Sequence, residues 1–78
     1  MKEKTNFINP SVFSDRLKSA QKERGMTCEE LAELLDVHPT TIPTWRNGKN
    51  LPSLDMAAGI AEIFGVSIDY LCGRCEEA

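Results

Sequence analysis

Two short helices joined by a tight turn are predicted between Thr27 and Asn47, and this stretch constrains the fold more than any other. Thr27 and Glu30 have the spacing of a capping box, in which each side chain accepts a hydrogen bond from the other residue's backbone amide. Asp36 stands where a left-handed residue would end the first helix. The buried side of that helix is predicted to consist of Leu31, Ala32, Leu34 and Leu35.

The second helix of the pair is predicted over residues 39–47, because Pro39 at the first helical position gives up an amide that has no partner there. Ile42 and Trp45 are three residues apart and are expected to face the core. Pro43 removes one helical hydrogen bond and crowds the preceding turn, so we expect a distorted or partly 3₁₀ turn there. The side opposite the core is expected to carry Thr40, Thr44 and Asn47.

Three further helices are predicted around this pair, over residues 12–24, 54–64 and 68–72. The Asn9-Pro10 step is expected to break any earlier helix, so residues 1–11 are expected to form a flexible N-terminal arm. Residues 74–78 are expected to form a frayed C-terminal tail. The helix over 54–64 is expected to bury Leu54, Ala57, Ala58, Ala61 and Phe64. The chain is therefore predicted to be all-α, with five helices in one compact domain.

Charge is distributed unevenly along the chain, although the net charge is only −3. Residues 1–26 carry six Lys/Arg and three Asp/Glu, and residues 38–53 carry two basic residues and no acid. Residues 27–37 carry four acids and no base, and residues 54–78 carry five acids and one base. A fold that brings the two basic stretches to one side is expected to have a basic face and an acidic back.

Length and composition are typical of a small cytoplasmic domain. The 78 residues suffice for one core, no apolar run approaches the roughly 20 residues of a membrane span, and the N-terminus lacks the apolar segment of a signal peptide. Three cysteines form an odd set that suits a reducing compartment. Zinc needs four ligands, and beside Cys72 and Cys75 only Cys28 and His38 are available, so no metal or cofactor is expected. No catalytic constellation is marked, so no enzymatic activity is expected.

Over residues 13–73 the chain resembles the Cro and lambda-repressor-like helix-turn-helix family, often called the XRE family. The similarity is carried by Arg16, Leu17, Leu31, Ala32, Val37, Ile42, Trp45, Asn47, Gly48, Lys49, Pro52 and the closing run from Ile60 to Leu71. The resemblance implies that residues 12–73 form a helix-turn-helix DNA-binding domain whose helix over 39–47 enters the major groove.

Carried over position by position, the resemblance implies two kinds of contact with double-stranded operator DNA. The base-contacting positions are Pro39, Thr40, Pro43 and Thr44. Threonine can hydrogen-bond a base edge or touch a thymine methyl group, whereas proline offers apolar contact alone. The phosphate-contacting positions are Thr27, Cys28, His38, Arg46, Asn47 and Lys49. The amides of Thr27 and Cys28 begin a helix and therefore suit an anion, whereas His38 either caps the following helix or touches a phosphate.

The sequence departs from the family pattern at positions that bear on binding. Asp36 replaces the usual glycine of the turn, and Gln21 stands where a second arginine is common. Arg46 stands where a glutamate is common, and we expect this exchange to bring it next to the like-charged Arg16. The reading face also lacks the Gln, Arg and Asn side chains that make paired hydrogen bonds with bases.

The resemblance implies a sequence-specific transcriptional regulator, and a repressor is expected. A module this small buries little surface on DNA, so a homodimer on two half-sites is expected, with contacts from Ile63 or Tyr70. The alternative is a protein-interaction module of the same fold, an antitoxin or an adaptor, which the acidic net charge and the weak reading face favour a little.

Overall fold

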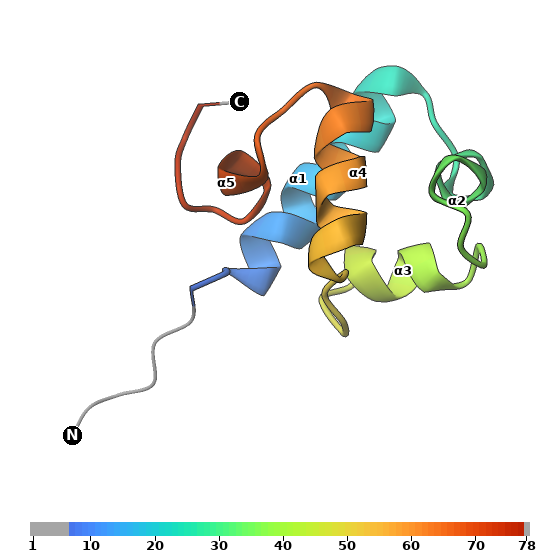
Figure 1. Cartoon of the computed structure of the whole chain (residues 1–78), viewed down its shortest axis with the longest axis horizontal. Coiled ribbons are helices and arrows are strands. Elements are labelled where there is room, and N and C mark those ends of the chain that lie inside the picture. Colours follow the sequence, from blue (N-terminus) through green and yellow to red (C-terminus); the bar gives the residue numbers. More distant parts are fainter. Residues whose placement is uncertain (1–6, 78) are drawn as a thin grey trace.

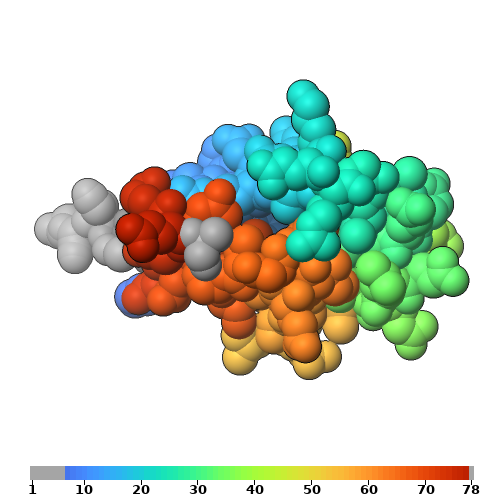
Figure 2. Space-filling model, turned by 90° about the horizontal axis from the view of Figure 1, so that it is seen from above, coloured from blue at the N-terminus to red at the C-terminus, as the bar shows by residue number. Residues whose placement is uncertain are grey.

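The computed structural model describes residues 7–77, in which five α-helices and no strand are present (Figure 1). The helices are α1 (Pro10–Arg24), α2 (Cys28–Leu35), α3 (Thr41–Arg46), α4 (Leu54–Phe64) and α5 (Ile68–Leu71). Helices α1 and α4 cross at the centre, with α2 and α3 on one side and α5 on the other. The space-filling view shows the same arrangement, with α2 and α3 (green) at the opposite end from the C-terminal residues (Figure 2). The all-α, five-helix prediction is confirmed.

Short polar side chains begin α2, α4 and α5 where the sequence predicts them. The capping box of α2 is complete, because the Glu30 amide donates to Thr27 Oγ1 at 3.0 Å and the Thr27 amide donates to Glu30 Oε1 at 2.9 Å. Ser53 and Ser67 accept from amides in the first turns of α4 and α5. Each of these bonds satisfies a donor that the helix itself leaves unpaired, so the local sequence decides where these helices start.

Helix α1 begins two residues earlier than predicted. Asn9 Oδ1 accepts from the amides of Ser11 and Val12, at 3.1 and 3.3 Å, and Pro10 occupies the first helical position. The expectation that the N-terminal arm extends to residue 11 was wrong, because a proline at the first helical position starts a helix at no cost in hydrogen bonds. Residues 7–9 precede the helix, and the part of the expected arm over residues 1–6 lies outside the described residues.

Helix α3 begins later than predicted, at Thr41, and Pro39 and Thr40 lie in the turn before it. Two bonds of the i to i+3 kind close this turn, from Thr41 N to the His38 carbonyl at 2.9 Å and from Ile42 N to the Pro39 carbonyl at 3.3 Å. Pro43 is thus the third residue of the helix, where an amide would have no helical partner. The expectation of a distorted or 3₁₀ turn at Pro43 was wrong, because the proline is accommodated without breaking α3 and the i to i+3 bonds lie in the turn before the helix.

The core lies where α1, α2, α3 and α4 meet, and α5 closes its far end. Its buried apolar residues are Phe13, Leu17, Leu31, Ala32, Leu35, Ile42, Trp45, Ile60, Ala61, Phe64 and Leu71. Gly59 has a role in this packing, because a Cβ atom there would lie 3.0 Å from Leu35 Cδ2. Glycine therefore allows α4 to approach α2 closely.

Three predicted core residues are exposed. Leu34 of α2 is 60% exposed, Leu54 at the start of α4 is 79% exposed, and Ala58 is exposed as well. Ile60, which was not predicted to be buried, is fully covered. The assignment on α4 was wrong because this helix is apolar on most of its circumference, so its periodicity does not identify the side that packs. Leu34 lies beside the buried Leu35 on α2, but its side chain faces outward.

No helix within residues 7–77 combines the length and the apolar character needed to cross a membrane.

Candidate nucleic-acid interface

Helix α3 is held against the domain by two buried side chains and one hydrogen bond from α1. Ile42 is fully buried and Trp45 is 4% exposed. Ser14 Oγ, itself buried, lies 2.9 Å from the Trp45 carbonyl and 2.9 Å from the Pro10 carbonyl. The carbonyls at a helix C-terminus lack helical partners, so the Ser14 hydroxyl stabilises the end of α3. These contacts fix which side of α3 faces outward.

The outward side of α3 and the turn before it carry the four residues predicted to contact bases. Pro39, Thr40 and Pro43 are exposed, and Thr44 is half-buried. The Thr44 hydroxyl donates to the Thr41 carbonyl at 2.6 Å, which leaves its oxygen lone pairs and its methyl group for contact with a ligand. The structure therefore places these side chains together on one accessible surface.

His38 is hydrogen-bonded to Thr40 in a way that sets its tautomer. The Thr40 amide donates to His38 Nδ1 at 3.2 Å, and Thr40 Oγ1 lies 2.9 Å from the same nitrogen. Because Nδ1 accepts, the neutral imidazole carries its proton on Nε2. The exposed ring is thereby able to donate a hydrogen bond, and the Thr40 oxygen keeps lone pairs for a donor such as the amino group of a base.

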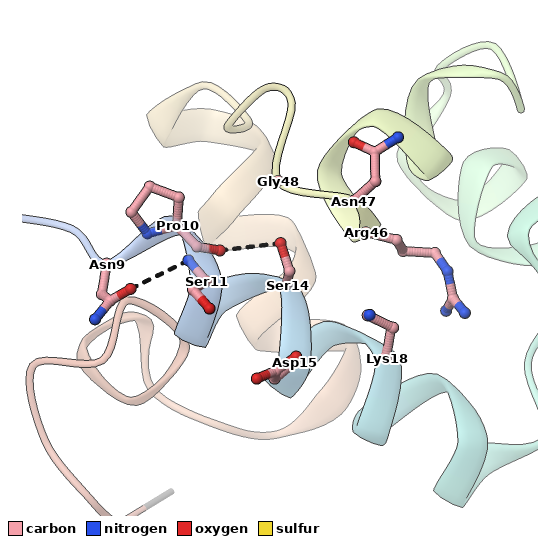
Figure 3. Close-up of a pocket in the computed structure, with 9 residues that line it drawn as sticks. All are labelled: Asn9, Pro10, Ser11, Ser14, Asp15, Lys18, Arg46, Asn47 and Gly48. Carbon is pink, nitrogen blue, oxygen red and sulfur yellow. Dashed lines mark hydrogen bonds between the residues drawn. The ribbon is translucent and has the colours of Figure 1, made fainter.

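The loop after α3 is tightly hydrogen-bonded and leaves two donors outside. Asn47 Oδ1 accepts from the Lys49 amide at 2.9 Å, and the Thr44 carbonyl accepts from the Lys49 and Asn50 amides at 2.9 and 3.1 Å. Asn47 and Lys49 are both exposed, and Asn47 points away from α1 (Figure 3). The Asn47 amide group and the Lys49 ammonium group are the donors that this loop can offer to an anion.

The start of α2 is less open to an anion than the sequence suggests. The Thr27 amide is already donated to the Glu30 carboxylate, and Glu29 and Glu30 add negative charge in the first turn. Thr27 Oγ1 accepts from Glu30 N but retains its own proton as a donor. Cys28 is half-buried, with its Sγ 3.9 Å from Gln21 Nε2.

Arg46 points toward α1 but does not pair with Arg16, so the expected contact between these two like charges was wrong. Arg46 Nη1 donates to Gln21 Oε1 at 2.5 Å. Arg16 instead extends toward the C-terminal segment, where it donates to the carbonyls of Tyr70 and Cys75 and lies 4.0 Å from the centre of the Tyr70 ring. Arg46 therefore lies between α3 and α1, with Gln21 and not Arg16 as its partner.

The basic residues of α1 divide between two sides of the domain. Arg16 packs on α5, and Arg24 donates to the Ile63 carbonyl of α4 at 3.2 Å. Lys18 and Lys22 are exposed on the side that includes Arg46. The basic face predicted from the charge pattern is therefore formed by only part of the first basic stretch, because packing directs the two arginines of α1 elsewhere.

Sequence reasoning missed the roles of Ser14 and Lys18 in this surface, and it marked Gln21 as a departure from the family pattern without its contact to Arg46. The Ser14 and Gln21 contacts join residues 31 and 25 positions apart, and no local pattern marks them. The spacing of Lys18 and Lys22, one helical turn apart, was a usable signal for a basic stripe.

Cys72 and Cys75 are free thiols, and within residues 7–77 no group of three or more His, Cys, Asp and Glu side chains is arranged to hold a metal ion. Cys72 is buried at the C-terminal end of α5. Burial raises the pKa of the Cys72 thiol above its ordinary value, Asp69 raises it further, and Arg74 opposes this effect.

Together these features define an all-α domain in which a short helix is packed on its neighbour and presents its outer side. A family model described as helix-turn-helix matches residues 17–71. The chain belongs to the Cro and lambda-repressor-like helix-turn-helix family, the XRE family.

The curated relatives include both an activator and a repressor of transcription. The chain is 36% identical over 59 residues to the HTH-type transcriptional activator BcrR of Enterococcus faecalis, a match covering 76% of this chain and 29% of BcrR. It is 30% identical over 62 residues to the CTXphi transcriptional repressor RstR of Vibrio cholerae, covering 80% of this chain and 55% of RstR. The chain thus spans about half or less of the length of these relatives.

Solved structures share the fold across proteins of different function. A transcriptional regulator from Listeria innocua superposes with a TM-score of 0.77 at 32% identity, covering 85% of this chain and 62% of that one. The P22 c2 repressor bound to a synthetic operator gives 0.76 at 17% identity, covering 81% and 96%, which shows the fold alone. Hydroxypropylphosphonic acid epoxidase from S. wedmorenis gives 0.74 at 29% identity, covering 86% of this chain and 36% of that one. Because an enzyme also contains this fold, function must be argued from the site.

Proposed function

We propose that this protein is a sequence-specific DNA-binding transcriptional regulator, a repressor and not an enzyme, that inserts α3 into the major groove. The observation that carries the proposal is the orientation of α3. Ile42 and Trp45 are buried while Thr40 and Pro43 are exposed, and no acidic residue occurs between residues 38 and 53. An outward helix without acidic side chains can approach the polyanionic duplex closely.

The exposed residues divide by chemistry into two sets. Thr40 and Thr44 offer hydroxyl and methyl groups to base edges, and Pro39 and Pro43 offer apolar contact to thymine methyl groups. The set proposed to contact phosphates consists of Thr27, Cys28, His38, Arg46, Asn47 and Lys49. These roles differ in their consequences, because base contacts determine sequence preference and phosphate contacts determine affinity for every duplex.

Paired mutations test this division. Selection from random duplexes first identifies the bound sequence, and binding of this sequence and of a scrambled duplex is then measured between 50 and 200 mM salt. Thr44→Ala is expected to reduce the preference for the selected sequence, whereas Lys49→Ala is expected to weaken binding to both duplexes alike and to reduce the salt slope by about 1. Equal effects of both mutations would argue against base reading by α3. If the protein binds no duplex even at 50 mM salt, the function is instead interaction with a protein partner.

We propose that two copies bind two half-sites, with contacts through the start of α4. Leu51 and Leu54 are exposed apolar side chains. They lie in and just after the short connection, residues 47–53, that joins α3 to α4. Ile63 and Tyr70, the candidates from sequence, are half-buried, and the Arg16 guanidinium lies over the Tyr70 ring. Self-association at Leu51 and Leu54 would bring two α3 helices near each other, as half-sites about 34–36 Å apart require.

Sedimentation of the complex with a two-half-site operator measures this association. Leu54→Glu is expected to convert a complex of two proteins per duplex to one, without loss of folding, because the side chain is exposed in the monomer. Tyr70→Glu is the matched comparison, because it places the same charge on α5, at the contact expected from sequence, and it should leave two proteins per duplex. Two proteins per duplex in Leu54→Glu, or one in the wild type, would contradict the proposed contact.

A further inference from the structure

A shallow groove follows α1 where α3 ends, and it consists of two adjoining hollows. The first is lined by Asn9, Pro10, Ser11, Ser14, Asp15, Lys18, Arg46, Asn47 and Gly48. The second is lined by Lys18, Gln21, Lys22, Gly25, Met26, Thr27 and Arg46. Both hollows share Lys18 and Arg46. Figure 3 shows Lys18 extending from α1 and Arg46 extending from α3 into the space between the two helices.

Positive charge dominates this groove. Lys18, Lys22 and Arg46 line it, and Asp15 is the one acidic side chain among the lining residues. Ser11, Asp15, Lys18 and Lys22 follow one another at intervals of three or four residues, so they form one exposed stripe along α1. The first turn of α1 contains no acid, but its amides already donate to Asn9, so side chains and not backbone amides supply the positive charge of the groove. The groove suits an extended anion better than a single ion.

Gln21 sets the position of Arg46 from beneath the groove. The Gln21 side chain is 3% exposed, and its Nε2 donates to the Met26 carbonyl at 3.2 Å. This bond fixes the orientation of the amide, so that Oε1 faces Arg46 and accepts from Nη1 at 2.5 Å. A neutral amide orients the guanidinium without cancelling its charge. The remaining N–H groups of Arg46 are left for a ligand in the groove.

We propose that Lys18 and Arg46 form a clasp for a phosphodiester group of the DNA backbone, with Gln21 as the residue that positions Arg46. This inference depends on the proposed DNA binding and extends it from α3 to α1. Guanidinium groups bind phosphate through two parallel hydrogen bonds, which requires the orientation that Gln21 provides. The backbone would pass along α1 beside the C-terminal end of α3.

Salt-dependent binding to a single selected duplex tests the clasp. Lys18→Gln and Arg46→Gln are each expected to lower affinity about five- to tenfold at 0.1 M salt and to reduce the slope of log affinity against log salt by about 1. Arg24→Gln is the matched control, because it removes the same charge from α1 on the side where Arg24 contacts α4. The control is expected to retain the wild-type slope.

Gln21→Glu tests whether the orientation of the Arg46 guanidinium matters, since this mutation leaves Arg46 itself in place. Glutamate can still accept the hydrogen bond from Arg46 but pairs with its charge, so the salt slope is expected to fall as in Arg46→Gln while sequence preference is unchanged. Thermal unfolding monitors the fold, and Lys18→Gln, at an exposed position, provides the test if Gln21→Glu is unstable. Slopes for Lys18→Gln and Arg46→Gln equal to that of Arg24→Gln would overturn the clasp, even where Thr44→Ala still changes sequence preference. No binding by the wild type would instead reject the proposed function itself.

Discussion

Asp36→Gly is expected to stabilise the domain, because the aspartate adopts a left-handed conformation at the end of α2. Asp36 has φ 60° and ψ 47°, and it is the one non-glycine residue with positive φ among those described. Its exposed carboxylate also lies at the negative end of the helix dipole. α2 has no basic side chain in its last turn to offset this charge.

The expected gain follows from three effects. Relief of the left-handed conformation contributes roughly 1 kcal/mol, at the low end for aspartate, whose short polar side chain tolerates this region. Removal of the carboxylate from the helix C-terminus adds about 0.3–1 kcal/mol. The greater freedom of glycine in the unfolded chain costs about 0.5–1 kcal/mol. We therefore expect a net gain in the free energy of unfolding of about 1 kcal/mol, or about 4–8 °C in Tm for a domain of this size.

Urea and thermal unfolding, monitored by helical circular dichroism, measure the change. The reverse mutation Gly65→Asp is the matched control, because Gly65 ends α4 with φ 68°, a Cβ there would meet no atom within 4 Å, and α4 also lacks a basic last turn. It is expected to destabilise the domain by a similar amount. Asp36→Asn isolates the charge, since asparagine tolerates the same conformation. A loss of stability in Asp36→Gly would refute the reasoning and indicate that the Asp36 carboxylate makes a stabilising contact.

Three further outcomes are expected from the same structure. Trp45→Ala is expected to lower the free energy of unfolding by about 3–5 kcal/mol, measured by urea unfolding, because the indole is buried between α3 and the core; a loss below 1 kcal/mol would contradict that packing. Ser14→Ala is expected to cost about 1 kcal/mol by removing the donor to the Trp45 carbonyl, and exposed Ser19→Ala, on the same helix, is its control. Because burial raises the pKa of the Cys72 thiol, its contribution to stability is complete below the ordinary thiol pKa and is lost as pH rises through the raised value. Urea unfolding at alkaline pH should therefore show a steeper loss in the wild type than in Cys72→Ala, and equal slopes would contradict this linkage.

The sequence by itself determined the five helices and the starts of α2, α4 and α5, because capping chemistry is local, whereas α1 and α3 begin at other residues than predicted. Thr27, Ser53 and Ser67 each accept from an amide three residues ahead, and Gly25 and Gly65 adopt the left-handed conformation that ends a helix. The positions of Ile42 and Trp45 also indicated which side of α3 is buried, since the other side of this helix is polar. The all-α fold and its family resemblance depend on signals of this kind.

Tertiary packing alone decided which side of α4 is buried and where the charged side chains of α1 point. The apolar residues of α4 surround most of the helix, and only its packing in the folded domain buries Ile60 and leaves Leu54 outside. The partners Gln21 and Arg46 lie on different helices, and their contact exists only once α1 and α3 are packed together. Local sequence cannot encode such a pair by periodicity, because its geometry depends on the crossing of two helices.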